Sequence, residues 1–242
     1  MKLLRGEVRK LGTIIAAITA AVAIASPAMA QLTPYYVAGD FNGWNAAGNV
    51  MTETSPGDNI WQVSLTLDAS ARHEFKVTEG DWSWSVPGSG NSWLLTDGAG
   101  NVTLTYNANT YADGWSPAQG RIGSSVDPGT WTAVGDWQSW NNTGNSMTSL
   151  GGGVYEFSAT LAPNTYQYKA VDTGTWDAIG LDSRGVNAAT LNFTTSAEDP
   201  TANFYVNALD GSIKVDVVPE PSTLMLVGAG LLGALALRRR KA

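Results

Sequence analysis

The sequence contains no cysteine and only one histidine. Without cysteine there is no disulfide framework, so the stability of the fold must come from packing. The scarcity of His and Cys also leaves no Ser-His-Asp or Cys-His catalytic constellation and no His/Cys zinc site. We expect His73 at the edge of a strand, and we predict that the chain is not an enzyme and holds no cofactor or metal.

Basic residues are scarce in the middle of the chain. Four of the fourteen Lys and Arg residues lie within residues 1–30 and four within 218–242, whereas only two of the twenty-one Asp and Glu residues do. Residues 31–217 therefore carry six basic and nineteen acidic side chains. So acidic a surface argues against nucleic acid and anionic membranes as partners, and it suits a neutral ligand.

The acidic residues do not form a pattern that predicts catalysis or calcium binding. A glycosidase needs two carboxylates at a set separation. Several of the acids, however, stand beside Gly, Asn or Ser, where Asp serves turns: Asp58, Asp97, Asp113 and Asp210. The group Asp172, Asp177 and Asp182 does not match the loop spacing that calcium coordination requires.

Residues 1–30 have the order of a secretory signal peptide. Basic residues come first, an apolar run extends from Leu11 to about Ser26, and Ala28-Met29-Ala30 follows as a small-residue cleavage site. We therefore predict export, with Gln31 as the first residue of the mature protein. A permanent membrane anchor is the alternative.

Residues 218–242 combine Pro219-Glu220-Pro221, an apolar segment at 222–237 and a basic cluster at 238–241. As a helix the apolar segment would be roughly 24 Å long, slightly short of a hydrocarbon core of about 30 Å. This order resembles the PEP-CTERM sorting signal of Gram-negative bacteria. The resemblance implies recognition by an exosortase, removal of the tail, and delivery to the cell envelope or the extracellular polysaccharide matrix. A plain single-pass anchor is the alternative.

The residues between these ends favour strands and turns. Gly, Asn, Thr and Ser are abundant, and ten Trp, eight Tyr and five Phe supply apolar area for a core. Residues 60–67 alternate strictly, which predicts a half-buried antiparallel strand with Trp61 in the core. Residues 73–79 predict the next strand, with Phe75 and Val77 facing inward.

The sequence also repeats itself. A strand-and-turn stretch, Val37-Ala38-Gly39-Asp40-Phe41-Asn42-Gly43-Trp44, is echoed by Val134-Gly135-Asp136-Trp137-Gln138-Ser139-Trp140. The offset stays nearly constant along the chain, at 96 residues for Gly39 and Gly135, 93 for Lys76 and Lys169, and 94 for Trp82 and Trp176. This internal duplication predicts two β-sandwich domains, 31–118 and 128–217, joined by a Gly-, Ser- and Pro-rich linker at 119–127.

Each repeat resembles the early-set, immunoglobulin-like α-glucan-binding modules, such as those of pullulanases and the glycogen-binding domain of the AMP-activated kinase β subunit. The shared blocks are the strand and turn above, a strand with Trp or Tyr, a strand with an aromatic residue and Lys, a G-x-W turn, and a later Asn. They recur in both halves, over 35–106 and 131–217. The resemblance implies an all-β fold of two tandem immunoglobulin-like sandwiches, flanked by the signal peptide and the apolar helix of the tail.

The resemblance also implies sugar-contacting residues: Trp44, Lys76, Trp82 and Asn91 in the first repeat, and Trp140, Lys169, Trp176 and Asn187 in the second. Trp84 competes with Trp82 for the same role. The second repeat departs from the family by having Trp137-Gln138-Ser139 where Phe-Asn-Gly is preferred.

Two functions of different classes follow. The first is non-catalytic binding of a starch- or glycogen-like α-glucan, or of a matrix polysaccharide, by a monomeric exported protein. The second is a structural envelope or matrix protein whose units only pack against other proteins. Exposed tryptophans distinguish them, because sugar binding needs aromatic faces in contact with solvent.

Overall fold

The computed structural model describes residues 34–109, 113–181, 184–185 and 187–219. These residues form an all-β fold, as predicted. The predicted signal peptide and the predicted apolar helix of the tail lie outside the described residues. Within the described ranges, no helix has the length and apolar character needed to cross a membrane.

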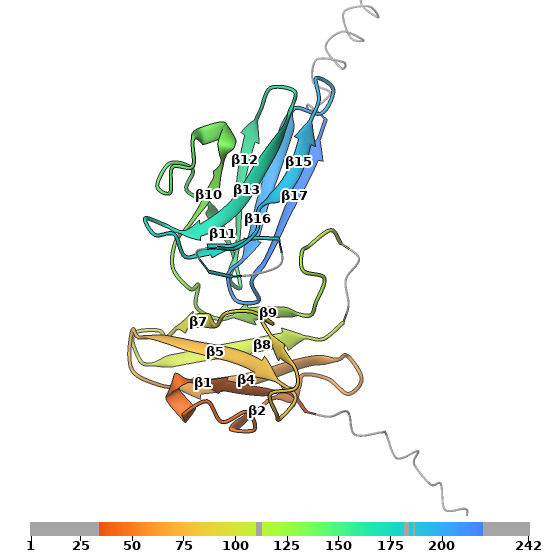
Figure 1. The fold of residues 1–242 in the computed structure, drawn as a ribbon. Helices are drawn as coiled ribbons and strands as arrows, with labels where there is room; N and C mark the ends of the chain where they lie inside the picture. Colours follow the sequence, from red (N-terminus) through yellow and green to blue (C-terminus); the bar gives the residue numbers. More distant parts are fainter. Residues whose placement is uncertain (1–33, 110–112, 182–183, 186, 220–242) are drawn as a thin grey trace, which may run out of the picture. The chain divides into compact units, whose positions relative to one another are not determined.

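The N-terminal half, residues 34–125, contains two antiparallel sheets (Figure 1). One has the order β2-β1-β5-β6, with β7 also paired to β5, and the other has the order β3-β4-β8-β9. The strands are β1 (Tyr36–Gly39), β2 (Asn49–Val50), β3 (Thr52–Glu53), β4 (Ile60–Thr66), β5 (Arg72–Thr78), β6 (Ser85–Val86), β7 (Ser92–Leu95), β8 (Asn101–Asn107) and β9 (Arg121–Ser124).

The C-terminal half, residues 128–219, also contains two antiparallel sheets. One has the order β10-β13-β14, with β15 paired to β13, and the other has the order β11-β12-β16-β17. The strands are β10 (Trp131–Gly135), β11 (Thr148–Gly151), β12 (Val154–Thr160), β13 (Asn164–Asp172), β14 (Ala178–Ile179), β15 (Leu191–Thr195), β16 (Thr201–Asn207) and β17 (Ser212–Val218).

Each half buries a hydrophobic core to which both of its sheets contribute. In the N-terminal half Trp61 of β4 packs in one cluster with Phe75 and Val77 of β5, so these three predicted core positions are confirmed. In the C-terminal half the core includes Tyr155 of β12 and Tyr168 of β13. The period-two alternation of apolar residues is what buries one face of each strand.

A strand lies inside the predicted linker. Residues 121–124 form β9, which pairs antiparallel with β8 over the register Leu104 to Ser124 through Asn107 to Arg121. Ile122 is buried in the core of the N-terminal half. The strand could not be predicted from the sequence, because residues 119–127 are rich in Gly and Ser and only four of them pair. Only two of those four residues are buried, so there is no clear apolar alternation. A purely flexible linker is therefore wrong for this stretch, while the domain boundaries at 118 and 128 stay a prediction.

The two halves contribute side chains to each other's cores. Trp93 of β7 belongs to the core of the C-terminal half, and its ring stacks on Trp131 with centroids 5.8 Å apart. Leu209, in the turn between β16 and β17, belongs to the core of the N-terminal half. Arg184 lies 3.3 Å over the Trp93 ring and donates to the Ala208 carbonyl at 3.1 Å. All described residues accordingly fall in one compact unit.

Candidate functional site

The turn after β1 holds a tryptophan in an unfavourable backbone conformation. β1 runs into a short 3-10 helix, η1 (Asp40–Asn42), and Gly43 and Trp44 follow with φ of 64° and 61°. The Trp44 amide donates to the Gly39 carbonyl at 2.8 Å and closes the turn. A non-glycine residue in the left-handed region costs about 1–2 kcal/mol, so the surrounding structure must hold Trp44 in place.

The same turn follows β10 in the C-terminal half. There η2 (Asp136–Gln138) is followed by Ser139 and Trp140, with φ of 58° and 57°. The Trp140 amide donates to the Gly135 carbonyl at 2.9 Å. Backbone strain of this kind persists where a site needs it. Its presence at the equivalent tryptophan of both repeats singles out these two side chains as candidates for function.

An amide side chain braces each turn. Asn42 Nδ2 donates to the Val37 carbonyl at 3.0 Å, and Gln138 Nε2 donates to the equivalent Ala133 carbonyl, also at 3.0 Å. The longer glutamine additionally reaches the Asn141 carbonyl at 2.8 Å. The departure from Phe-Asn-Gly in the second repeat therefore leaves this brace, and the conformation it supports, unchanged.

An aromatic ring lies against the glycine that starts each turn. A Cβ added to Gly39 would lie 2.4 Å from Cε1 of Phe41, and one added to Gly135 would lie 1.9 Å from Cζ3 of Trp137. Glycine is thus required at both positions by close approach. Trp137, which replaces the smaller phenylalanine, stacks on Phe204 of the C-terminal core with ring centroids 4.6 Å apart.

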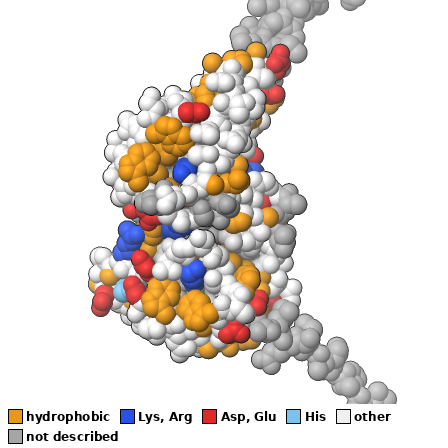
Figure 2. Space-filling view, in the orientation of Figure 1, with side chains coloured by type: hydrophobic (Ala, Val, Ile, Leu, Met, Phe, Trp, Pro, Cys, Tyr) orange, Lys and Arg blue, Asp and Glu red, His pale blue; other side chains and the backbone are white. Residues whose placement is uncertain are grey.

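A second tryptophan is exposed near each turn. The side chains of Trp82 and Trp176 are 51% and 49% exposed. The Trp82 ring lies 6.3 Å from that of Trp44, at an interplanar angle of 47°. Figure 2 shows hydrophobic side chains at the surface of each half, with a Lys or Arg side chain beside them.

The turns that carry Trp140 and Trp176 are joined by hydrogen bonds. Asn142 Nδ2 donates to the Thr175 carbonyl at 3.0 Å, and the Gly174 amide donates to the Asn142 carbonyl at 2.9 Å. Trp140 itself packs against a small cluster that includes Val134 and Val171. One face of this ring is therefore supported by the protein.

Trp84 occupies a different environment from Trp82. Its ring lies 5.8 Å from that of Tyr35 and 6.0 Å from that of Tyr106, and it packs against the core of the N-terminal half. The sequence left the choice between Trp82 and Trp84 open. Exposure favours Trp82 as the aromatic surface that a ligand can reach.

The predicted lysines lie on matching strands. Lys76 of β5 pairs with Ala38 of β1, and Lys169 of β13 pairs with Val134 of β10. Lys76 Nζ donates to the Pro87 carbonyl at 3.0 Å. Both ammonium groups are half-buried, and desolvation lowers the pKa of each below its usual value. Each lysine thus reaches the surface from the strand next to the one that leads into the tryptophan turn.

The two predicted asparagines differ in their contacts. Asn91 Nδ2 donates to Glu74 Oε2 at 2.9 Å, which orients the Asn91 amide, whereas Asn187 is exposed. Glu74 lies two residues before Lys76 on β5 and so shares its face. Glu74 is not among the residues of the repeated motif. Its alternation with the buried Phe75 was the signal that placed it on the outer face.

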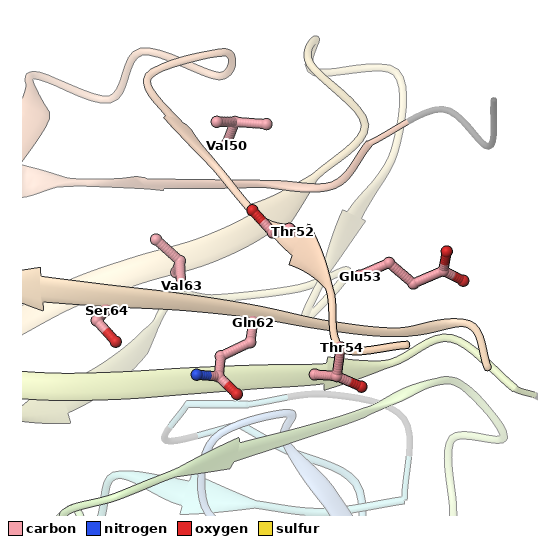
Figure 3. A pocket seen from close by; sticks show the side chains of 7 residues that line it. All are labelled: Val50, Thr52, Glu53, Thr54, Gln62, Val63 and Ser64. Carbon is pink, nitrogen blue, oxygen red and sulfur yellow. The ribbon is translucent and has the colours of Figure 1, made fainter. Parts of the chain in front are cut away.

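A separate hollow of about 420 Å³ lies where the chain crosses from β2 to β3 (Figure 3). Its lining residues are Val50, Thr52, Glu53, Thr54, Gln62, Val63 and Ser64. None is aromatic and none belongs to the predicted set, so the hollow is distinct from the tryptophan sites. In the described part of the chain, no group of three or more His, Asp or Glu side chains is placed to hold a metal ion.

The C-terminal tail matches a known family model. Residues 217–241 match the PEP-CTERM protein-sorting motif. The chain carries a sorting signal. The predicted PEP-CTERM sorting signal is thereby confirmed, and the roles of Pro219, Glu220 and Pro221 within it stay a prediction.

The chain is also similar in part to an amylase and to two solved structures. An alpha-amylase of Niallia circulans is 31% identical over 84 residues, which cover 33% of this chain and 6% of the amylase. Two solved structures cover 78% and 77% of the chain at 14% identity: SusF from Bacteroides thetaiotaomicron (TM-score 0.33) and a pullulanase from Bacillus acidopullulyticus (TM-score 0.28). The chain spans 49% of the first and 28% of the second.

Proposed function

We propose that this protein binds carbohydrate without catalysing a reaction, and that its ligand is an α-glucan of the starch or glycogen type or a matrix polysaccharide. The observation that carries the proposal is the strained tryptophan of each half, held by the same turn and accompanied by a tryptophan that is about half exposed. Exposed aromatic rings in this number favour a ligand site over the alternative of a purely structural envelope protein.

The chemistry of each site suits a sugar. A pyranose ring presents C–H groups that stack on an aromatic face, and a few polar groups fix its orientation. Trp44 and Trp82, or Trp140 and Trp176, supply the faces. Lys76 and Lys169 supply donors to hydroxyl groups without the need for a charged ligand. The partial match to a protein named alpha-amylase supports an α-glucan as the ligand class.

Removing the exposed tryptophans should remove binding. We expect Trp82→Ala and Trp176→Ala each to weaken binding by about 2 kcal/mol, or roughly 30-fold, as for aromatic anchors at interfaces. The double variant should not be retarded in an affinity gel containing glycogen or soluble starch. The measurement uses residues 31–219, which include every strand that the structure describes.

Leu150→Ala is the matched control, because Leu150 is 56% exposed and lies outside both sites. It should bind like the native protein, and all variants should melt within a few degrees of it. Native-like retardation of the double variant would show that these two tryptophans do not carry the binding, and absence of retardation of the native protein would favour the structural envelope protein instead.

The two ends of the chain support an exported protein that is processed at the cell envelope. The order of residues 1–30 supports removal of a signal peptide, and the matched motif at 217–241 supports an exosortase as a processing partner. We propose the envelope or the extracellular matrix as the final location.

Mass spectrometry of the native exported protein should find an N-terminus at Gln31 and no peptide containing Arg238–Lys241. The same protein expressed in cells that lack an exosortase is the control, and it should retain the basic cluster. Recovery of the intact tail from the producing organism would instead indicate a plain membrane anchor.

A further inference from the structure

Another hollow, of about 370 Å³, lies where the N-terminal and C-terminal halves meet. The loop before β9 lines it with Asp113 and Trp115, and the other lining residues belong to β8, β9, the β11–β12 hairpin and the end of β16. The volume is within the range of about 300–1,000 Å³ that is typical of small-molecule sites. The hollow shares no residue with the two tryptophan sites or with the hollow at β2 and β3.

Trp115 is a tryptophan that neither a core nor the proposed function explains. The sequence has ten tryptophans. Six of them pack in or against the hydrophobic clusters: Trp61, Trp84, Trp93, Trp131, Trp137 and Trp140. Three of the remaining four, Trp44, Trp82 and Trp176, belong to the proposed tryptophan sites. The fourth, Trp115, is half-buried and lines the hollow, where its ring offers apolar contact to a ligand.

The loop that carries Trp115 is held in place. Ser116 exchanges two backbone hydrogen bonds with Ile213 of β17, both of 2.9 Å. The Trp115 amide donates to Asp113 Oδ1 at 3.3 Å, and the Trp115 ring lies 6.2 Å from that of Tyr205. A ligand would therefore meet a ring that is already positioned, which lowers the entropic cost of binding.

Asp113 and Arg121 place polar groups beside this ring. Arg121 Nη1 donates to the Gln119 carbonyl at 2.7 Å, and Nη2 lies 3.3 Å from Asp113 Oδ1. The guanidinium lies 5.3 Å over the Trp115 ring. The carboxylate oxygens can accept and the guanidinium can donate hydrogen bonds, so the pair can fix the orientation of a ligand that has hydroxyl groups.

The charges in and around the hollow favour an uncharged ligand. Among the described residues, one acidic and one basic side chain line it, and they form the ion pair just described. Near the neighbouring Tyr205, Lys214 pairs with Asp216 at 3.0 Å, and Glu156 interacts with Tyr205 itself. The lining is thus neutral and its surroundings are slightly acidic, which disfavours anions.

Two glycines leave backbone exposed at the hollow. Gly151 and Gly152 have φ of 86° and 65°, and a Cβ added to either would meet no atom within 4 Å. Both residues are exposed and line the hollow. Without side chains here, a ligand can approach the backbone closely.

We propose that this hollow is a third sugar site, in which one or two units of a neutral gluco-oligosaccharide stack on Trp115 and hydrogen-bond to Asp113 and Arg121. The proposal rests on the carbohydrate-binding function proposed above. Since so few sugar units make contact, we expect a dissociation constant on the order of 1 mM. One site of this strength would not retard the chain in an affinity gel, so it is compatible with loss of retardation in the double variant of Trp82 and Trp176.

Nuclear magnetic resonance of the chain 31–219, titrated with maltotriose, tests the site. We expect saturable shifts of the Trp115 indole N–H signal and of the Gly151 and Gly152 amide signals, all with the same dissociation constant. The double variant Trp82→Ala with Trp176→Ala should keep these shifts, because it leaves the hollow intact.

Two substitutions of Trp115 separate sugar stacking from a merely structural role. Trp115→Ala should abolish the shifts of Gly151 and Gly152, whereas Trp115→Phe keeps an aromatic face and should retain them. The amide signals of Ser116 and Ile213 check that the loop stays on β17 in both variants. Glycine shifts that persist in Trp115→Ala would overturn the assignment of Trp115 as the stacking face.

The indole signals of Trp82 and Trp176 in the native protein distinguish this proposal from the proposed function. If they shift while the signals of Trp115, Gly151 and Gly152 do not, the third site is wrong and the proposed function stands. The reverse result would support the third site and contradict the roles of Trp82 and Trp176. If no signal shifts at about ten times the expected dissociation constant, both proposals are contradicted.

Discussion

Replacement of Trp93 by alanine is expected to lower the free energy of unfolding by about 3–5 kcal/mol, the range of large-to-small changes at buried aromatic residues. The Trp93 side chain is only 4% exposed, stacks on Trp131, and donates its indole N–H to the Pro128 carbonyl at 3.1 Å. Its removal also uncovers the guanidinium of Arg184, which lies 3.3 Å over the ring. Urea denaturation of the chain 31–219, followed by circular dichroism, measures the loss.

Trp176→Ala is the control for this change, since it deletes the same side chain at a position that is 49% exposed. It should change the free energy of unfolding by less than about 0.5 kcal/mol. If Trp93→Ala does not fold, Trp93→Phe keeps a ring in the core and should lose only about 1–2 kcal/mol. Equal effects of the Trp93 and Trp176 alanine variants would contradict the shared core.

The buried carboxyl of Asp210 should make the protein less stable as the pH rises from about 4 to 7. Asp210 is fully buried, and desolvation raises its pKa to about 7 from an ordinary 3.8. In this interval the unfolded chain loses the proton while the folded chain keeps it, so stability falls as pH rises. The loss levels off above the folded pKa and amounts to about 4 kcal/mol in total.

Asp210→Asn is the variant that tests this dependence. Asp210 Oδ2 accepts the Ile122 amide at 3.2 Å, and Oδ1 accepts the Ser212 amide at 3.0 Å. An asparagine side chain has only one oxygen and cannot accept both hydrogen bonds. The variant protein should therefore be less stable than the native protein at every pH. The informative quantity is therefore the slope of unfolding free energy between pH 4.5 and 7. The slope should become much shallower in the variant, and unchanged slopes would refute the assignment.

Local pattern was sufficient to predict the strands that the structure places at Ile60–Thr66 and Arg72–Thr78. Strict alternation marks residues 60–66, and burial of Trp61 and Leu65 follows from it. The same logic failed at 121–124, where β9 has no long apolar run and owes its formation to pairing with β8. Tertiary pairing of a short strand leaves little trace in sequence.

The sequence correctly predicted that Asp210 lies in a turn, but it did not predict that the side chain is fully buried. The Asp-Gly dipeptide does form a turn, and Ser212 donates to its carboxylate. Its burial depends on residues far away in sequence, among them Ile122, which no local pattern could reveal.

The candidate site could be predicted in part because its tryptophans belong to a repeated motif. The sequence could not choose between Trp82 and Trp84, which are separated by one residue and face different surroundings. Nor could it show that Asn91 is held by Glu74, because that hydrogen bond joins residues 17 positions apart. The site assignment itself stays a prediction.

The place of Leu209 in the N-terminal core has a consequence for biosynthesis. A ribosome adds about 5–20 residues per second, so roughly 4–17 s pass between completion of β9 and the appearance of residue 209. During this interval the nascent N-terminal half lacks one of its own buried side chains and exposes the apolar surface that Leu209 will cover. The side chain that closes this core is translated only shortly before the sorting motif at 217–241. The N-terminal core can therefore be completed only at nearly the same time as the sorting motif is synthesised.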